Sequence, residues 1–199
     1  MTQHINGSTN NLTPDLTQGY VLWLTGLSGA GKTTITVALE KELKARGERV
    51  ERLDGDTVRE GLTRDLGFSK EDRDKNIERV GFVAKLLSRN GVGVLCAFIS
   101  PYREARLKIR QDSTNFIEVY VSASVATCAA RDVKGLYAKA LAGEIKNFTG
   151  VSDPYEAPEA PEIIVTDQET VEQSVAKIVD YLEQRGFVRQ LSAVEGSRV

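Results

Sequence analysis

Short runs of apolar residues alternate along this chain with polar segments in which apolar positions recur at helical spacing. Residues 20–24 form the first run, which is apolar throughout, as in strands that are buried on both faces. The segment after it carries Ile35, Ala38, Leu39 and Leu43, a spacing that places them on one helix face. Alternation of this kind predicts parallel strands joined by crossover helices. We therefore expect a three-layer α/β fold, in which helices cover both faces of a five-stranded parallel sheet.

The same pattern predicts the other elements. Ser69 is expected to cap a long helix that ends at Gly91, and Asp167 is expected to cap the closing helix, which begins near Val171. The remaining predicted strands are residues 49–53, 92–99, 116–121 and 163–165, and the remaining predicted helices are residues 103–111 and 124–130.

Two segments depart from this alternation. Residues 1–18 are polar and read as a flexible arm, so that residues 19–199 form a single domain. Residues 132–161 are rich in glycine, proline and charge, which is typical of an irregular segment. A plain surface loop would explain them, but long insertions in compact domains tend to be functional. We therefore expect residues 132–161 to form a mobile lid over a binding site.

Composition excludes several classes of protein. The 199 residues carry a net charge of −2, so we expect no nucleic acid and no membrane surface as a partner. No apolar run has the length of a bilayer span, and the polar N-terminus lacks a signal peptide, so a cytoplasmic location is expected. Cys96 and Cys128 are interpreted as buried, inert thiols. His4 is the only histidine and lies in the arm, which excludes a histidine base within the domain.

The most specific motif lies between the first strand and the first helix. It fits the phosphate-loop pattern G-x-x-x-x-G-K-[ST], and its position between a strand and a helix is the context that the pattern requires. Glycines let backbone N–H groups converge on phosphate oxygens, Lys32 supplies a positive charge, and Thr33 offers a hydroxyl to Mg²⁺. A glycine-rich turn without a ligand is the alternative. The predicted ATP-binding residues are Gly26, Leu27, Ser28, Gly29, Ala30, Gly31, Lys32, Thr33 and Thr34.

Polar clusters follow the other strands, and in open α/β sheets ligands bind beyond the carboxyl ends of strands. Asp54-Gly55-Asp56 follows the second strand and suits either a site beside Mg²⁺ or an ordinary helix-capping turn. Ser100 follows the third strand, where a phosphate-binding hydroxyl and a simple Ser-Pro turn are equally compatible with the spacing. The arginines Arg59, Arg73 and Arg79 suit a second anionic substrate, although a salt-bridged helix is the default for any one of them.

The assembled motifs resemble the adenylylsulfate kinase family from about Tyr20 to Phe187. The motifs between Arg131 and Glu156, in and beside the expected lid, are not shared by general phosphate-loop kinases. The matching motifs are Gly26 to Thr33, Leu53-Asp54-Gly55-Asp56, Leu66-Gly67-Phe68-Ser69, Asp72-Arg73, Asn76-Ile77, Ile99-Ser100-Pro101-Tyr102-Arg103, Arg131 to Tyr137, Gly143-Glu144-Ile145, Phe148-Thr149-Gly150 and Pro154-Tyr155-Glu156.

The resemblance implies an activity and a set of site residues. The family uses ATP and Mg²⁺ to phosphorylate the 3′-hydroxyl of adenosine 5′-phosphosulfate in sulfate assimilation, and it is typically homodimeric. The resemblance further implies that Lys32, Asp54 and Ser100 are catalytic, that Thr33 and Asp54 lie near Mg²⁺, and that Phe148 stacks on the substrate adenine. It assigns Arg131 to ATP, and to adenylylsulfate it assigns Asp56, Arg59, Phe68, Arg73, Asn76, Ile99, Ser100, Lys134 and Phe148.

Some alternatives stay open at this point. Ser100 is often described in the family as a phosphoserine intermediate, but direct in-line transfer needs fewer steps. Many relatives have arginine where this chain has Glu78 and glycine where it has Asn147, which bears on substrate affinity and lid flexibility. The alternative functions are another small-acceptor kinase, of nucleoside monophosphate or sugar-acid type, a nucleotide-dependent switch protein, and an inactive relative.

Overall fold

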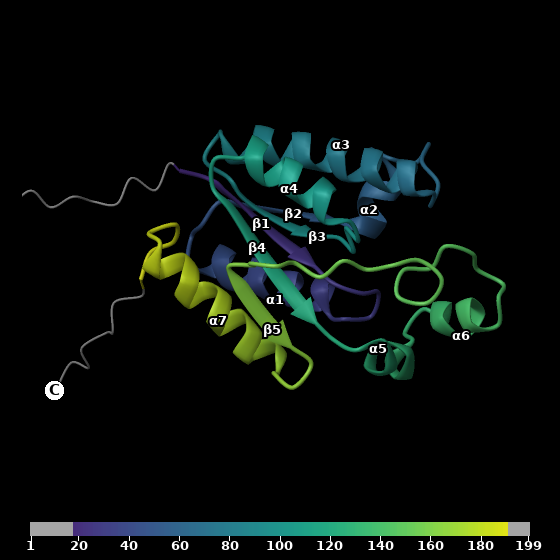
Figure 1. The fold of residues 1–199 in the computed structure, drawn as a ribbon. Coiled ribbons are helices and arrows are strands. Elements are labelled where there is room, and N and C mark those ends of the chain that lie inside the picture. Colours follow the sequence, from purple (N-terminus) through teal and green to yellow (C-terminus); the bar gives the residue numbers. More distant parts are fainter. Residues whose placement is uncertain (1–17, 191–199) are drawn as a thin grey trace, which may run out of the picture.

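The computed structural model describes residues 18–190, which form one parallel sheet with helices on both faces (Figure 1). The strand order is β2-β3-β1-β4-β5, and every neighbouring pair is parallel. The strands are β1 (Tyr20–Thr25), β2 (Val50–Asp54), β3 (Gly93–Ala97), β4 (Phe116–Ser122) and β5 (Ile163–Thr166). The helices are α1 (Lys32–Ala45), α2 (Gly55–Glu60), α3 (Lys70–Ser88), α4 (Arg103–Asp112), α5 (Val125–Arg131), α6 (Leu136–Leu141) and α7 (Val171–Gln184).

The central strand β1 explains why both faces of the sheet are covered. Its side chains alternate between two apolar clusters, Leu22 and Leu24 on one side and Val21 and Trp23 on the other. Helices α1 and α7 pack on the first face, and α3 and α4 pack on the second (Figure 1). Because every residue of β1 is buried, this strand is apolar throughout rather than alternating. The predicted fold class is therefore confirmed.

The helix caps explain where two of the helices begin. Ser69 accepts a hydrogen bond from the Asp72 amide and caps α3, as expected. The expectation that Asp167 caps the last helix is wrong. The chain turns once more after β5, and Thr170 forms a reciprocal capping box with Gln173 at the start of α7. The Asp167 amide instead donates to the Ser122 carbonyl.

Other departures from the expected elements are small. The third strand is shorter than expected, Gly93–Ala97, because the chain leaves the sheet before the turn at Ser100. Two short helices, α2 and α6, were not among the predicted elements. Helix α2 is mostly polar, and α6 lies within residues 132–161, which were expected to be irregular. Among residues 18–190, no helix is long and apolar enough to cross a membrane. Apart from Gln18, the predicted arm lies outside the described residues, and so does His4.

Candidate active site

The loop between β1 and α1 has a backbone that only glycine adopts readily. Gly26, Gly29 and Gly31 have φ angles of 152°, 74° and 110°, in the region that L side chains disfavour. A Cβ on Gly26 would come within 2.4 Å of the Val121 carbonyl oxygen, so a larger residue would displace β4. The loop leads into α1, where free amides and the helix dipole favour an anion.

Lys32 is buried at the base of this loop, with 8% of its surface exposed. Its Nζ donates to the carbonyl oxygens of Gly26 at 2.9 Å and Leu27 at 2.7 Å. Burial lowers the pKa of Lys32 to about 8, because the charged form loses its hydration. Two carbonyl dipoles thus hold the ammonium at the base of the loop, and no carboxylate among residues 18–190 pairs directly with it.

Thr33 and Asp54 bring two oxygen donors together beside the loop. The Thr33 hydroxyl donates to Asp54 Oδ2 at 2.7 Å, although the two residues come from α1 and the end of β2. Asp54 is buried, and its other oxygen accepts from the Asp56 amide at 3.1 Å, which caps α2. The helix-capping interpretation of Asp54-Gly55-Asp56 is therefore confirmed, and the same carboxylate lies beside the Thr33 hydroxyl. Within residues 18–190, no group of three or more metal-ligating side chains is present.

The second strand also delivers residues of the expected acceptor side. Lys134 of the lid donates to Asp56 Oδ2 at 2.5 Å, so an exposed ion pair bridges the lid and α2. The Arg59 guanidinium lies 4.3 Å from the centroid of the Phe68 ring, and 63% of the surface of Phe68 is exposed. Asn76 lies deeper, where its side-chain oxygen accepts from the buried Thr63 hydroxyl at 2.7 Å.

Arg73 connects the acceptor side to the lid. Its guanidinium donates to the Thr149 hydroxyl and to the Asn147 carbonyl, each at 2.5 Å. Phe148, between these residues, packs edge-on against Tyr137 with ring centroids 4.9 Å apart. Tyr137 in turn donates to the Ser28 carbonyl of the phosphate loop at 3.0 Å. One lid segment therefore contacts both the loop and the arginine.

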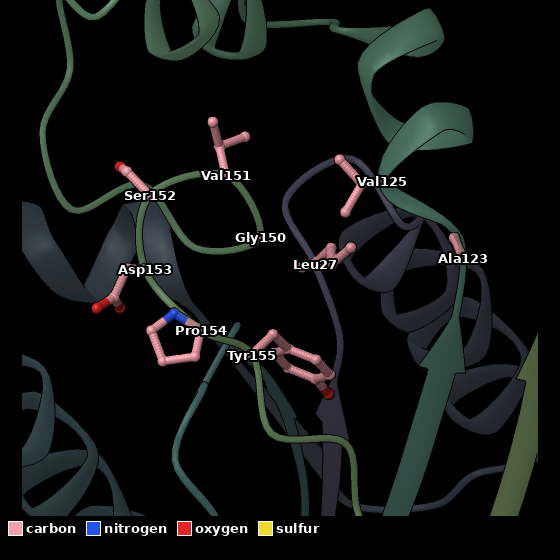
Figure 2. Close-up of a pocket in the computed structure, with 9 residues that line it drawn as sticks. All are labelled: Leu27, Ala123, Val125, Gly150, Val151, Ser152, Asp153, Pro154 and Tyr155. Carbon is pink, nitrogen blue, oxygen red and sulfur yellow. The ribbon is translucent and has the colours of Figure 1, made fainter.

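Further contacts hold the lid above the phosphate loop. Arg131 donates to the Gly29 carbonyl at 3.3 Å and to the Ala30 carbonyl at 3.5 Å. The lid loop 150–155 lies opposite Leu27 and Val125 (Figure 2), and a Cβ on Gly150 would come within 2.9 Å of the Leu27 side chain. A pocket of about 580 Å³ lies between them, and it is lined by Leu27, Ala123, Val125, Gly150, Val151, Ser152, Asp153, Pro154 and Tyr155.

Ser100 is buried in a strained turn after β3. Its φ of 40° is unusual for a residue with a side chain and costs of the order of 1 kcal/mol or more. The Ser100 hydroxyl accepts from the Trp23 indole at 3.0 Å and donates toward the Thr25 hydroxyl at 3.0 Å. Thr25 donates to the Ile99 carbonyl at 2.8 Å, so Ile99 and Ser100 belong to one network.

One of the alternative interpretations is now settled. Arg79 forms a two-pronged ion pair with Asp65, at 2.6 and 2.8 Å, which is the salt-bridged helix that the sequence also allowed. Glu78 pairs with Lys108 across to α4 at 2.8 Å. Asn147 has a φ of 57°, a left-handed conformation that asparagine tolerates better than most residues with a side chain.

Both cysteines are buried, as expected. Burial raises the pKa of the Cys96 thiol and, less strongly, that of the Cys128 thiol, which keeps both protonated near neutral pH. Neither cysteine forms a disulfide within the described chain.

Sequence reasoning missed three residues of this region, because each acts through contacts far along the chain. Tyr137 and Tyr155 lie within motifs of the family resemblance, but nothing in the sequence assigned either of them a role in the site. Arg106 is buried in α4, with 2% of its surface exposed, and pairs with Glu118 at 2.8 Å. A sequence signal did exist for that pair, since Glu118 is a single charge inside an otherwise apolar predicted strand.

A phosphate loop at the end of a central parallel strand, facing arginines under a long connection, defines this protein as a phosphate-loop kinase. The model of the family described as adenylylsulphate kinase matches residues 18–166. The chain belongs to this family, and the expected resemblance is confirmed.

Individual relatives agree with the family match. The chain is 69% identical over 162 residues to a probable adenylyl-sulfate kinase of Pseudomonas aeruginosa, covering 81% of this chain and 76% of that protein. The structure of Mycobacterium tuberculosis APS kinase in complex with AMPPNP and APS is 40% identical, with a TM-score of 0.81 over 83% of this chain and 98% of that one. A hexameric APS kinase from Thiobacillus denitrificans is 34% identical, with a TM-score of 0.67 over 89% of this chain and 31% of that one.

Proposed function

We propose that this chain transfers the γ-phosphoryl group of ATP to the 3′-hydroxyl of adenosine 5′-phosphosulfate (adenylyl-sulfate), giving ADP and the 3′-phosphorylated product. Membership of the adenylylsulphate kinase family supports this reaction. The observation that carries the proposal is the lid segment that touches both the Ser28 carbonyl and Arg73. Such an arrangement suits two anionic substrates that must meet under one cover.

The phosphate loop is proposed to bind the triphosphate through its amides and Lys32. Two anionic substrates repel each other, and the loop amides together with the Lys32 ammonium offset that repulsion during transfer. The two carbonyl groups that accept hydrogen bonds from Lys32 offer only partial negative charge. A phosphate oxygen is therefore the stronger partner for the ammonium. Arg131, whose donors now rest on the loop carbonyls, is proposed to turn toward ATP.

Magnesium is proposed to arrive with ATP. The Thr33 hydroxyl and the Asp54 carboxylate are hard oxygen donors, and Mg²⁺ is usually held by one or two such groups together with substrate phosphates. When bound, the ion would neutralise charge on the phosphates. Asp54 also lies beside the loop where an acceptor hydroxyl would enter, and we assign it the role of orienting that hydroxyl.

The acceptor is proposed to bind on the side of α2 and α3. Exposed Phe68, with Arg59 stacked on it, and Phe148 of the lid offer aromatic faces for an adenine. Arg73 offers a guanidinium fork for a phosphate or sulfate. The proposed contacts are those that the family resemblance implies, at Asp56, Arg59, Phe68, Arg73, Asn76, Ile99, Ser100, Lys134 and Phe148.

Ser100 is proposed to position the acceptor rather than to carry the phosphoryl group. Its hydroxyl already exchanges hydrogen bonds with Trp23 and Thr25, and burial leaves it 3% exposed. No histidine lies within residues 18–190, so no imidazole is present to activate it. Direct in-line transfer needs neither an activating base nor a second transfer step.

The proposal extends to the lid, the oligomeric state and the location. Closure of residues 132–161 would exclude water and limit wasteful ATP hydrolysis. A homodimer is proposed from the family resemblance, and a related kinase from Thiobacillus denitrificans is hexameric. The cytoplasmic location stays a prediction.

The test is a coupled assay of ADP release with ATP, Mg²⁺ and purified adenylyl-sulfate, with chromatography to identify the 3′-phosphorylated product. AMP and gluconate replace the acceptor in parallel reactions. We expect turnover with adenylyl-sulfate to exceed turnover with AMP by about 100-fold. AMP lacks the sulfate, so the side chains that would bind the sulfate are left without a partner when AMP is bound. Equal turnover with AMP would contradict the proposal and favour a nucleoside monophosphate kinase.

A further inference from the structure

Arg106 of α4 joins three separate parts of the molecule beneath the site. Its Nε donates to Glu118 Oε1 on β4 at 2.8 Å, and this carboxylate balances its charge. Its Nη1 donates to the Ser100 carbonyl at 2.5 Å, and its Nη2 donates to the Glu156 carbonyl at 2.7 Å. With 2% of its surface exposed, the side chain has no room to rearrange toward solvent.

One of the two carbonyl groups belongs to the strained turn. Ser100 has a left-handed backbone, which persists only where its surroundings hold it in place. Trp23 and Thr25 hold its side chain, whereas Arg106 holds its carbonyl. The direction of the Ser100 peptide, and with it the floor of the proposed acceptor site, therefore depends on the guanidinium.

The other carbonyl belongs to the segment in which the lid returns to the sheet. The Glu156 amide donates to the Pro101 carbonyl at 2.9 Å, and the Glu156 carboxylate accepts from the Arg103 amide at 2.8 Å. Tyr155 shares a hydrogen bond of 3.0 Å with the Thr25 hydroxyl. The return segment is thus fixed to the same turn from several sides, and Arg106 lies between the two.

We propose that Arg106 is a positioning residue for the acceptor, because one planar fork sets the spacing between the Ser100 turn and the return segment of the lid. The inference rests on the proposed function, since it assigns these two segments to acceptor binding. Lysine keeps the charge but lacks the fork, so it cannot hold both carbonyl groups and Glu118 at once. A buried ion pair is weak evidence for a stabilising role, which leaves geometry as the reason for an arginine.

The experiment compares Arg106→Lys with Arg110→Lys on the same helix. Arg110 pairs with the same Glu118, at 3.2 Å, and with Glu162, at 2.5 and 2.8 Å, so it shares the charge network but neither carbonyl. We expect Arg106→Lys to lower kcat/KM for adenylyl-sulfate by about 10- to 100-fold, the usual consequence of a displacement near 1 Å. The Kd for AMPPNP alone should stay within about twofold of wild type, since the phosphate loop is untouched. Arg110→Lys should stay close to wild type in both quantities.

Hydrogen exchange supplies a reading that does not depend on turnover. In Arg106→Lys, peptides covering residues 99–104 and 153–158 should exchange hydrogen faster than in Arg110→Lys. Peptides of the phosphate loop should exchange at the same rate in both variants. If Arg106→Lys folds poorly, Arg106→Gln replaces it, because a neutral amide can donate to one of the two carbonyl groups while Glu118 keeps Arg110 as its partner; the same slower acceptor kinetics and faster exchange are expected. Equal exchange and equal kinetics in the two lysine variants would overturn the inference. If the wild type does not phosphorylate adenylyl-sulfate, the proposed function fails. The comparison of hydrogen exchange between the two lysine variants still decides the role of Arg106.

Discussion

The phosphate loop and the proposed acceptor side of the site are built in different ways. The loop consists of backbone groups from consecutive residues, and glycines at Gly26, Gly29 and Gly31 alone make its conformation accessible. The acceptor side is assembled from side chains that meet over long stretches of chain, such as Arg73 with Thr149 and Trp23 with Ser100. A local motif can be recognised in any sequence that contains it. An assembled surface exists only once the chain has folded.

The two parts should also respond differently to substitution. Loss of the Lys32 side chain should remove catalysis and spare the fold, because its ammonium contacts only carbonyl groups of the loop itself. Substitutions on the proposed acceptor side should weaken binding of the acceptor alone. Each should have a moderate effect, because several side chains are proposed to contact that substrate.

Lys32→Ala should have the largest effect. We expect kcat to fall by about 100- to 1000-fold, because the ammonium meets charge that develops on the transferring phosphoryl group. The melting temperature should change little, since a buried charge that has lost its hydration adds little to stability. Steady-state kinetics and thermal denaturation measure the two quantities, and normal turnover would refute the role of the loop.

Arg73→Lys should have a smaller effect, confined to the acceptor. We expect KM for adenylyl-sulfate to rise by about tenfold, because lysine cannot present a two-pronged donor to an oxyanion. KM for ATP should stay the same. The matched control is Arg79→Lys on the same helix, because Arg79 pairs with the exposed Asp65 and not with a lid residue. An equal rise of KM for adenylyl-sulfate in Arg73→Lys and Arg79→Lys would contradict a specific role of Arg73 in acceptor binding.

The affinity of the phosphate loop for nucleotide should depend on pH through the titration of Lys32. The pKa of Lys32 is about 8 in the folded protein and near 10.5 in the unfolded chain. Between these values the unfolded chain holds the proton and the folded chain does not, so the contribution of Lys32 to stability rises with pH across this window. Nucleotide binding needs the charged form, so affinity for AMPPNP should fall about five- to tenfold between pH 7 and pH 9.

Lys32→Arg is the matched control for this titration, since a guanidinium stays charged throughout the range. Calorimetric titration at several pH values gives the affinities. A flat profile in the wild type would show that the folded-state pKa of Lys32 is not lowered.

Asn147→Gly should have the smallest effect. Its φ of 57° suits glycine as well as asparagine, so the substitution relieves a little strain and adds chain freedom to the lid. We expect the free energy of unfolding to change by less than about 1 kcal/mol and KM for adenylyl-sulfate by less than about threefold. Chemical denaturation and steady-state kinetics test this, and Asn147→Val is the contrasting variant, because a β-branched residue disfavours that backbone strongly.

The sequence by itself determined the order of the strands along the chain, most helices and the phosphate loop, because periodicity and glycine placement act over neighbouring residues. It did not determine the short helices α2 and α6, or that Thr170 rather than Asp167 caps α7, since those ends depend on where the chain leaves the sheet. Only the tertiary structure decided which polar residues meet. Arg73 rests on the lid while Arg79, six positions later, pairs with Asp65, although both look alike in the sequence. Arg106 beneath Ser100 is the same kind of result, because a contact between distant residues is fixed by packing and not by local pattern.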